Sequence, residues 1–340
     1  MAAIIAAMHL PAHVPLVTVT RGGFPELVHV GSIAVVDRAG KLVAGVGDPQ
    51  GVNFTRSSLK PFQAVPFLDD GGMDRYGFGS QELALMCASH SGEAVHVGVV
   101  RGMLERLDTD ASALQCGRHA PYFYSATEQA PPANVTWSTL HHNCSGKHCG
   151  FLACCRLHGE ALGNYLDPDA NVQQRFRKSL AAQVGSDALV RGTDGCSAPN
   201  YALPLAQLAR MFARLACDDT AALAALRYAM TRHPDLVSGT GRTDLALMQA
   251  GRGDWVSKIG ADGVQAIGIR SKGIGIAIRI ADGNPRALHA ATVEALQQLG
   301  LLDDAAGTPL ARYARPALRN SRGLDVGRVE PVFALPRLHA

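Results

Sequence analysis

The segment GVQAIGIRSKGIGIAIRI, residues 263–280, decides the fold, because it predicts two short strands joined by a tight turn. Both halves, 263–269 and 273–280, are rich in β-branched residues and are punctuated by glycine. Residues 255–258 predict another strand directly before them, and residues 285–300 predict a helix with alanine, valine and leucine along one side. Strand structure therefore dominates this late part of the chain.

The first fifty residues predict strands as well, and the middle of the chain predicts helices. Early strands are expected at 13–20, 27–36 and 41–46, with a turn at 37–40. Helices are expected at 57–69, 80–88, 93–107, 146–158, 170–184, 203–216 and 219–232. The pattern indicates an α+β fold in which both chain ends build one antiparallel sheet around an inserted helical region. We expect one region from 1–56 and 250–340, a helical one over 57–249, and an active site in the cleft between them.

Composition excludes several classes of protein. The 340 residues are 47% hydrophobic and 18% charged, which is an ordinary globular balance. A net charge of +3 is too weak to indicate a nucleic-acid partner, and no apolar run approaches the ~20 residues of a membrane span. The start, MAAIIAAMHLPAHVPLV, lacks a basic region and predicts mature chain rather than a signal peptide. The eight cysteines are therefore expected as reduced thiols, some of them as metal ligands.

A serine and a lysine lie three residues apart in RSSLK, residues 56–60. Ser57 and Lys60 would share one face of a helix, and a desolvated neutral lysine can activate a serine as nucleophile. The alternative is a helix cap at Ser57 and a surface charge at Lys60. The run CASHSGE, residues 87–93, carries a second serine, Ser89, whose position helix capping does not explain.

Two late lysines compete as partners for a second serine. Lys258 lies on an expected strand that ends at Gly260, where it can face a cleft or serve as an edge-strand charge. Lys272 lies in the expected hairpin turn at 270–273, where a solvated lysine is the simpler interpretation.

The most unusual stretch is HHNCSGKHCG, residues 141–150. Cys144 precedes a helix, and Lys147 or His148 could supply a neighbouring metal ligand, with Cys196 from the glycine-rich loop 192–197 closing a zinc site. The spacing is not a standard zinc pattern. Another polar glycine loop, 239–244, places Arg242 where it could hold a substrate carboxylate or lie in a simple turn.

Taken together, these segments resemble the rhizobial-type L-asparaginases, the asparaginase II family. The resemblance covers about residues 15–335 and rests on six runs that occur in order: RSSLKPFQ at 56–63, CASHSGE at 87–93, NCSGKH at 143–148, DGCSAP at 194–199, GTGR at 239–242 and SKIG at 257–260. Each run is short, but together they are specific. The resemblance implies a fold akin to serine β-lactamases and serine glutaminases.

The resemblance also implies an activity and a set of site residues. The reaction is hydrolysis of L-asparagine to L-aspartate and ammonia, with no nucleic acid or membrane as partner. Its catalytic groups would be Ser57, Lys60, Ser89 and Lys258, with Ser57 preferred as the nucleophile. One Zn²⁺ per chain would be held by Cys144, Lys147 and Cys196. Substrate binding falls to Arg56, His90, Asp194, Gly241 and Arg242, and we expect a cytoplasmic homodimer.

Departures from related motifs leave two other functions open. Ser89-His90-Ser91 lacks the asparagine of the β-lactamase Ser-x-Asn motif, and Ile259 replaces a threonine, which argues against β-lactam processing. The alternatives are a serine-type glutaminase or penicillin-recognising acyl hydrolase on the same fold, and a non-enzymatic, zinc-stabilised binding module. Comparison of amide substrates discriminates among them.

Overall fold

The computed structural model describes residues 10–336 and divides them into two compact units. The first unit is formed by residues up to 56, by 202–214 and by residues from 257 onward. The second unit comprises 57–201 and 215–256. The interpretation of the N-terminus as mature chain concerns residues that lie mostly outside the described range.

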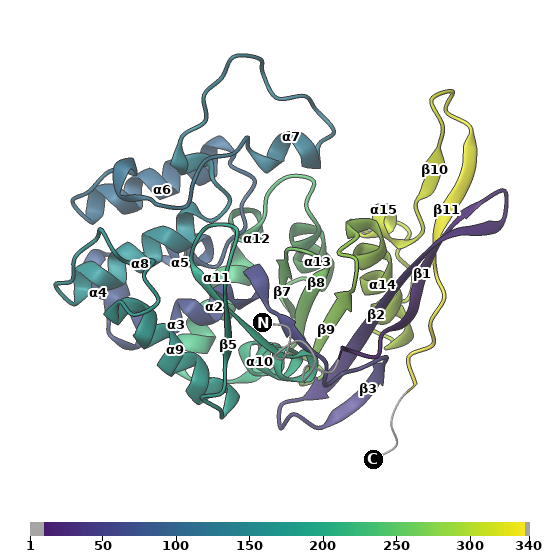
Figure 1. Ribbon diagram of the computed structural model, residues 1–340, viewed down its shortest axis with the longest axis horizontal. Helices are drawn as coiled ribbons and strands as arrows, with labels where there is room; N and C mark the ends of the chain where they lie inside the picture. The colour runs from purple at the N-terminus through teal and green to yellow at the C-terminus, as the bar shows by residue number, and fades with distance from the viewer. Residues whose placement is uncertain (1–9, 337–340) are drawn as a thin grey trace. The chain divides into compact units, whose positions relative to one another are not determined.

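The first unit is built on an antiparallel sheet to which both chain ends contribute (Figure 1). Its strand order is β10-β11-β1-β2-β9-β8-β7, and β3 also pairs with β2. The bounds are β1 Val14–Arg21, β2 Phe24–Asp37, β3 Leu42–Val46, β7 Trp255–Gly260, β8 Val264–Ile269, β9 Ile274–Ile280, β10 Ala317–Arg319 and β11 Asp325–Pro331. The central pairs β1–β11, β1–β2 and β2–β9 are all antiparallel, which confirms the expected α+β class and the joining of the two ends.

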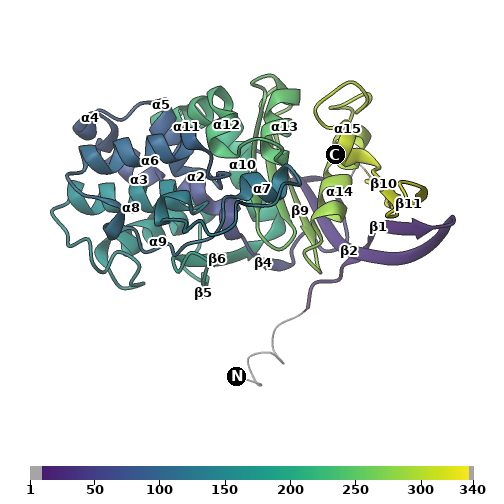
Figure 2. The same ribbon diagram turned by 90° about the horizontal axis from the view of Figure 1, so that it is seen from above.

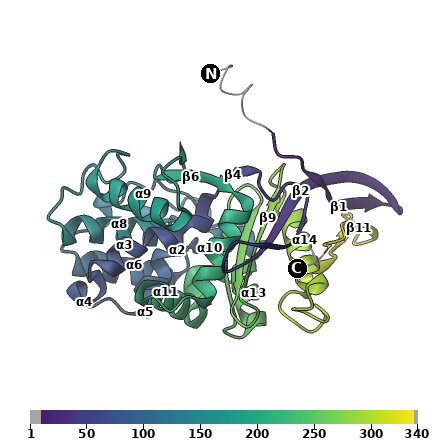
Figure 3. The same cartoon turned by 90° about the horizontal axis from the view of Figure 1, so that it is seen from below.

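The middle of this sheet is buried on both faces. Ala34 of β2 lies opposite Ala277 of β9, and both are fully buried. Helix α14 (Pro285–Gln298) packs against β1, β8, β9 and β11, as Figures 2 and 3 show. Helix α10 (Leu205–Cys217) approaches β9 so closely that a Cβ atom at Gly275 would lie 1.8 Å from the carbonyl oxygen of Ala209. Only glycine therefore fits at position 275.

The second unit is helical, and four of its helices pack against α5. Helix α5 (Ser80–Met86) contacts α6, α8, α11 and α12. The elements are η1 Arg56–Leu59, α2 Lys60–Gln63, α3 Val65–Asp69, α4 Gly72–Tyr76, α6 Ala94–Arg106, η2 Ala111–Ala113, α7 Tyr122–Ala126, η3 Thr139–His141, α8 Ser145–Leu157, α9 Asn171–Val184, α11 Ala221–Arg232, α12 Pro234–Val237 and α13 Thr243–Gly251. A small sheet, β4 (Val52–Phe54), β6 (Pro199–Pro204) and β5 (Val190–Thr193), and the short helix α15 (Ala311–Ala314) complete the chain.

Two local expectations differ from the structure. The helix expected over 57–69 is broken into η1, α2 and α3, because Pro61 and Pro66 lack the N–H groups that a continuous helix needs. Strand β6, between the loop at 192–197 and α10, is not among the strands that the sequence predicts. Within the described residues, no helix is both long and apolar enough to cross a membrane.

Candidate active site

The amine of Lys60 is the best-defined polar group of the candidate site. Lys60 begins α2 and is only 1% exposed, and its Nζ donates to the carbonyl oxygen of Ala88 and lies 3.0 Å from the Oγ of Ser89. A buried lysine is expensive unless its nitrogen is hydrogen-bonded, so these two partners account for its position. The structure thus joins two of the predicted catalytic residues across 29 positions of sequence.

Ser57 lies one turn before Lys60, and no hydrogen bond joins their two side chains in the described residues. The Ser57 side chain is buried, and its hydroxyl has no hydrogen-bond partner among residues 10–336. The preceding residue, Arg56, has φ 51°, in the left-handed region that a non-glycine side chain rarely adopts. Such strain clusters at functional sites. The guanidinium of Arg56 forms an ion pair with Asp262, within the first unit.

The segment that carries Ser89 is tied down along its backbone. Ser89 donates its N–H to the Val237 carbonyl (3.0 Å), and His90 donates its N–H to the Asn143 carbonyl (3.2 Å). The hydroxyl of Ser91 donates to the carbonyl of Ser238 at 3.2 Å. The turn after α5 is therefore held from two sides, and this fixes the Ser89 hydroxyl before any substrate arrives.

His90 is a buried, neutral imidazole whose two nitrogens already have protein partners. Its Nδ1 accepts the N–H of Gly92 at 3.1 Å, so its proton lies on Nε2, 2.8 Å from the Oγ of Ser145. Burial, with repulsion from His96 and Lys60, holds the pKa of His90 well below its usual value. The predicted substrate-binding role of His90 stays a prediction, and the contacts observed support the conformation of the Ser89 segment.

Cys144, Lys147 and Cys196 form one buried cluster, as the resemblance implies. Cys144 precedes α8, Lys147 lies in its first turn, and Cys196 comes from the loop between β5 and β6. The Nζ of Lys147 lies 2.9 Å from the Sγ of Cys196. The hydrogen bond from the Cys144 thiol and the charge of Lys147 hold the pKa of Cys196 well below its usual value. The same hydrogen bond to Cys196, together with burial, raises the pKa of Cys144.

The charge state of Lys147 follows from the same contacts. Burial by itself would lower the pKa of Lys147, but attraction to Cys196, Cys144 and Asp194 outweighs it and raises the pKa. The directions of these two pKa shifts favour an ammonium at Lys147 beside a thiolate at Cys196. An amine binds a metal only after it loses its proton, which a neighbouring dication favours.

His148 and Tyr165 lie next to this cluster. The Nδ1 of His148 lies 2.7 Å from the hydroxyl of Tyr165, and that hydroxyl accepts the N–H of Gln115 at 2.7 Å. Since the hydroxyl proton of Tyr165 needs an acceptor, His148 Nδ1 accepts it and Nε2 carries the ring proton. The buried Nε2 of His148 has no well-formed hydrogen bond, and the charged groups near His148 include the sulfur of Cys196. We therefore assign His148 an outer position around Cys196.

The donor set fits a zinc ion only if Lys147 contributes. Two thiols and an amine in one buried cluster are nitrogen and sulfur donors of the kind that zinc binds. Among residues 10–336, no group of three or more histidine, cysteine, aspartate or glutamate side chains is arranged to hold a metal ion. A zinc site here would consequently use Cys144, Lys147 and Cys196, with His148 outside it, and zinc itself stays a prediction.

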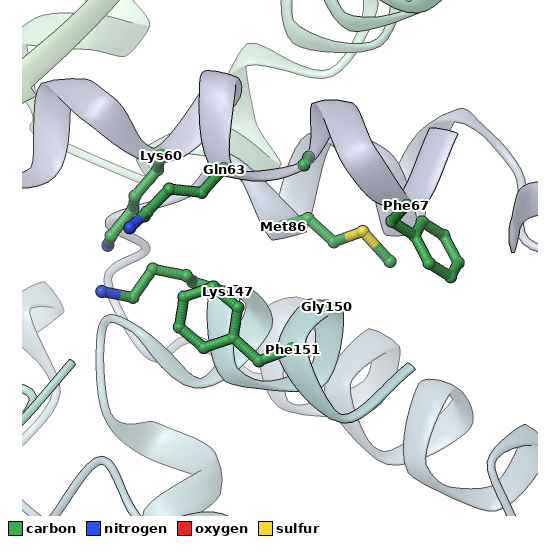
Figure 4. Close-up of a pocket in the computed structure, with 8 residues that line it drawn as sticks. Lys60, Gln63, Phe67, Met86, Lys147, Gly150 and Phe151 are labelled. Carbon is green, nitrogen blue, oxygen red and sulfur yellow. The ribbon is translucent and has the colours of Figure 1, made fainter. Parts of the chain in front are cut away.

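A small cavity lies between the two lysines and an apolar wall (Figure 4). Figure 4 shows the amine ends of Lys60 and Lys147 at one end of the cavity and the side chains of Met86 and Phe67 at the other. Its volume is about 10 Å³, close to the minimum for one water molecule. Helices α2 and α8 therefore bring the amines of two buried lysines to the same place.

Two loops carry the remaining predicted substrate-binding residues of the second unit. Arg242 lies with its guanidinium 5.2 Å from the ring centroid of Tyr122. At Gly241, with φ 74°, a Cβ would lie 2.6 Å from the Ala126 carbonyl oxygen, so glycine is required there. Asp194 is buried, and its Oδ1 accepts the N–H of Gly195 at 2.9 Å.

Sequence reasoning missed Tyr122, Tyr165 and Asn143. Burial raises the pKa of the Tyr122 hydroxyl, and the charges that act on it include Arg242, Cys144 and Asp194, so Tyr122 lies among the predicted residues. Asn143 belongs to the run at 143–148 but was assigned no role, and its Oδ1 lies 3.1 Å from Nε2 of His119. These tyrosines belong to no motif, and only their three-dimensional neighbours reveal them.

Lys258 belongs to the first unit. It lies on β7, at one edge of the sheet, yet it is 0% exposed, which excludes the interpretation as a solvated edge-strand charge. Its Nζ donates to the carbonyl of Ile259 at 2.8 Å. The rival Lys272 is exposed in the turn between β8 and β9, as expected. The pairing of Lys258 with Ser89 stays a prediction.

Comparison with known proteins identifies the class. The sequence profile of L-asparaginase II matches residues 17–331, almost the whole chain. The protein therefore belongs to the L-asparaginase II family, and this membership supports an amidohydrolase role. A search of curated proteins finds no match.

Solved structures show only weak likeness. The crystal structure of Mglu in 4.3 M NaCl is 15% identical with a TM-score of 0.44, and the match covers 80% of this chain and 61% of that one. A β-lactamase from Mycobacterium bovis is 13% identical with a TM-score of 0.36, and the match covers 88% of this chain and 99% of that one. The chain thus spans less than two thirds of the length of Mglu.

Proposed function

We propose that this protein is an L-asparagine amidohydrolase that uses serine and lysine side chains. Family membership supports amide hydrolysis, and the observation that carries the catalytic assignment is the buried contact between Lys60 Nζ and Ser89 Oγ at 3.0 Å. Serine becomes a nucleophile or a proton relay only beside a base, and a lysine in a desolvated site is such a base.

The geometry supports a proton relay with Lys60 at its centre. In this proposal Ser57 attacks the side-chain amide carbon and its hydroxyl proton passes to Lys60. The Ser89 hydroxyl, 3.0 Å from Lys60 Nζ, then delivers its proton to the leaving ammonia and takes in return the proton that Lys60 received from Ser57. Water hydrolyses the resulting ester by the reverse sequence, which releases aspartate and restores Ser57.

The contacts of Lys60 fit this task. A neutral amine has two N–H donors and one lone pair. One N–H is given to the Ala88 carbonyl, and the lone pair is then available to the Ser89 hydroxyl proton or to that of Ser57. The amine of Lys147 lies on the opposite wall of the small cavity in Figure 4.

Substrate recognition is proposed to use the charges around Tyr122. L-Asparagine carries a carboxylate and an ammonium on its α-carbon. Arg242, held over the ring of Tyr122, can bind the carboxylate, and the buried Asp194 can bind the ammonium. Lys258 is proposed as the second catalytic lysine, Arg56, His90 and Gly241 as supporting residues, and a cytoplasmic homodimer as the working form.

Zinc is proposed as a structural or orienting ion. Cys144, Lys147 and Cys196 would hold it, and its chemistry would be to fix α8 against the loop that carries Cys196. The serines and lysines already supply a nucleophile and a base, so water activation by the metal is not required.

The test of this function is ammonia release from L-asparagine and from L-glutamine by the purified protein. We expect much faster turnover of asparagine, because one additional methylene in a small pocket can cost about 1–3 kcal/mol. Equal kcat/KM for both amides would contradict the specificity. Absence of turnover in metal-replete protein would contradict the activity itself and favour a binding module.

A further inference from the structure

A second, larger hollow of the helical unit lies apart from every predicted site residue. It is a groove of about 630 Å³ beside α6, and its volume lies in the ordinary range for small-molecule sites of about 300–1,000 Å³. Its lining residues come from the beginning of α6 and from the segment around α7 and η3. The lining residues that carry the argument are Ala94, Gly98, Arg101, Tyr124, Trp137 and His141.

The helix wall of the groove is nearly bare. Ala94, Val97, Gly98 and Arg101 are spaced i, i+3, i+4 and i+7, so they share one face of α6. A Cβ built at Gly98 meets no atom within 4 Å. A mid-helix glycine costs about 1 kcal/mol relative to alanine, and here no neighbour requires it. The consequence of Gly98 is open space along this face.

The opposite wall is aromatic. The ring of Tyr124 lies 5.5 Å from that of Phe123 and 5.7 Å from that of Trp137, and Trp137 lies 5.1 Å from the ring of His141. All four side chains are half-buried rather than packed into the core. A bare helix face opposite half-exposed rings makes a slot that suits a flat apolar group.

Charge distinguishes the two ends of the slot. At the start of α6, the carboxylate of Glu93 already has two hydrogen-bond donors. Thr240 donates its backbone N–H at 2.9 Å and its side-chain hydroxyl at 2.8 Å. Further along the helix, Arg101 is exposed and has no ion-pair or hydrogen-bond partner among the described residues. The available charge in the groove is therefore positive, which favours an anionic group at the Arg101 end.

We propose that this groove binds a small carboxylate that carries a flat aromatic ring, with the ring between Gly98 and Trp137 and the carboxylate on Arg101. The site goes beyond the proposed asparagine hydrolysis, since asparagine has no ring to fill the slot. It also contacts the catalytic segment, because Gly92 lines the groove and Phe123 donates its N–H to the carbonyl of Ser91 at 3.0 Å. An occupant would therefore restrain the turn that carries Ser89.

The experiment measures binding of 3-phenylpropionate to the full chain by tryptophan fluorescence. The protein has two tryptophans, Trp137 in the groove and the buried Trp255, so the groove residue reports ligand contact. We expect saturable quenching in the wild type and at least about tenfold weaker binding in Gly98→Leu, whose side chain fills the slot. Gly102→Leu is the matched control, because Gly102 also has open space but does not line the groove.

Charge and location are tested separately. Arg101→Gln should weaken 3-phenylpropionate about tenfold and leave the neutral analogue 3-phenyl-1-propanol unchanged. Quenching that saturating L-aspartate abolishes and that Gly98→Leu leaves intact would place the probe in the amidase site and overturn the proposal. No binding by the wild type up to about 10 mM probe would overturn it too. Neither result would affect the assay of asparagine hydrolysis.

Discussion

The Nζ of Lys60 lies 3.0 Å from the Oγ of Ser89, and both side chains are buried. The sequence pattern relates Lys60 to Ser57, whereas in the folded protein the amine of Lys60 contacts a serine 29 residues away. Ser89 thus contacts the amine of Lys60 directly, whereas Ser57 is related to Lys60 only by its position one turn earlier in the chain. This arrangement sets the kinetic expectations.

Removal of any member of this group should nearly abolish turnover. Ser57→Ala, Lys60→Ala and Ser89→Ala should each raise the barrier by several kcal/mol, and the double variants should cost little more than the single ones, because the residues act as a unit. Steady-state kinetics with L-asparagine measures this, with circular dichroism to confirm folding. Ser58→Ala is the control and should be far milder. Substantial activity in Ser57→Ala would rule out Ser57 as the nucleophile.

The two late lysines should behave differently. Lys258→Ala should lose nearly all activity, because Lys258 is a buried cation that the resemblance assigns to catalysis. Lys272→Ala should retain near-normal kcat/KM, because its side chain is exposed in a hairpin turn. If the outcomes are reversed, the assignment of the second lysine is wrong.

Zinc content should depend on the cysteine cluster. Elemental analysis of the purified protein should find about one zinc per chain, and Cys196→Ser should lose it, since a hydroxyl replaces a thiolate ligand. Cys149→Ser is the control, because this buried cysteine of α8 lies outside the predicted ligand set. Unchanged metal content in Cys196→Ser would remove that residue from the site. Full activity after chelation would agree with a structural role.

Gly146 should be intolerant of any side chain. A Cβ at this position would lie 2.2 Å from the carbonyl oxygen of Leu85, where α8 crosses α5. Gly146→Ala should therefore lower the free energy of unfolding by roughly 1–3 kcal/mol or more. Gly102→Ala in α6 has open space and should raise it by up to about 1 kcal/mol. Urea denaturation compares the two, and similar effects would contradict the close helix crossing.

Stability should fall on mild acidification. Burial lowers the pKa of His90 and of His96, so below the usual value of about 6.5 the unfolded chain takes up protons that the native chain refuses. The free energy of unfolding then decreases as pH falls, by up to about 1.4 kcal/mol per pH unit for each histidine. Urea midpoints between about pH 7.5 and pH 5 measure this slope.

His96→Gln tests the origin of that slope. Nδ1 of His96 accepts the N–H of Glu93 at 3.1 Å, and Nε2 donates to the carbonyl of Asp235 at 2.9 Å, so only the neutral ring satisfies both contacts. Glutamine offers a donor and an acceptor but does not titrate. A slope as steep as that of the wild type would exclude His96 as a cause.

Patterns of adjacent residues determined much of this fold. The β-branched runs at 27–36 and 273–280 predicted β2 and β9, because short, nearly continuous apolar runs suit strands that are buried on both faces. The apolar period at 285–300 predicted α14 in the same way. The residue pattern placed Cys144 and Cys196 in one expected zinc site and left Lys147 and His148 as alternative ligands, and the resemblance to a family selected Lys147. Strand β11 carried too little local signal, although it pairs with β1 at the other end of the chain.

The tertiary structure decided which groups meet. Local rules extend three or four residues and therefore related Lys60 to Ser57, whereas the partner of Lys60 is set by the packing of α2 against the turn after α5. The tyrosine behind His148, the rings around the groove beside α6 and the burial of Lys258 on an edge strand were likewise invisible in the sequence. Buried polar groups must find partners, and chain folding brings those partners from distant positions.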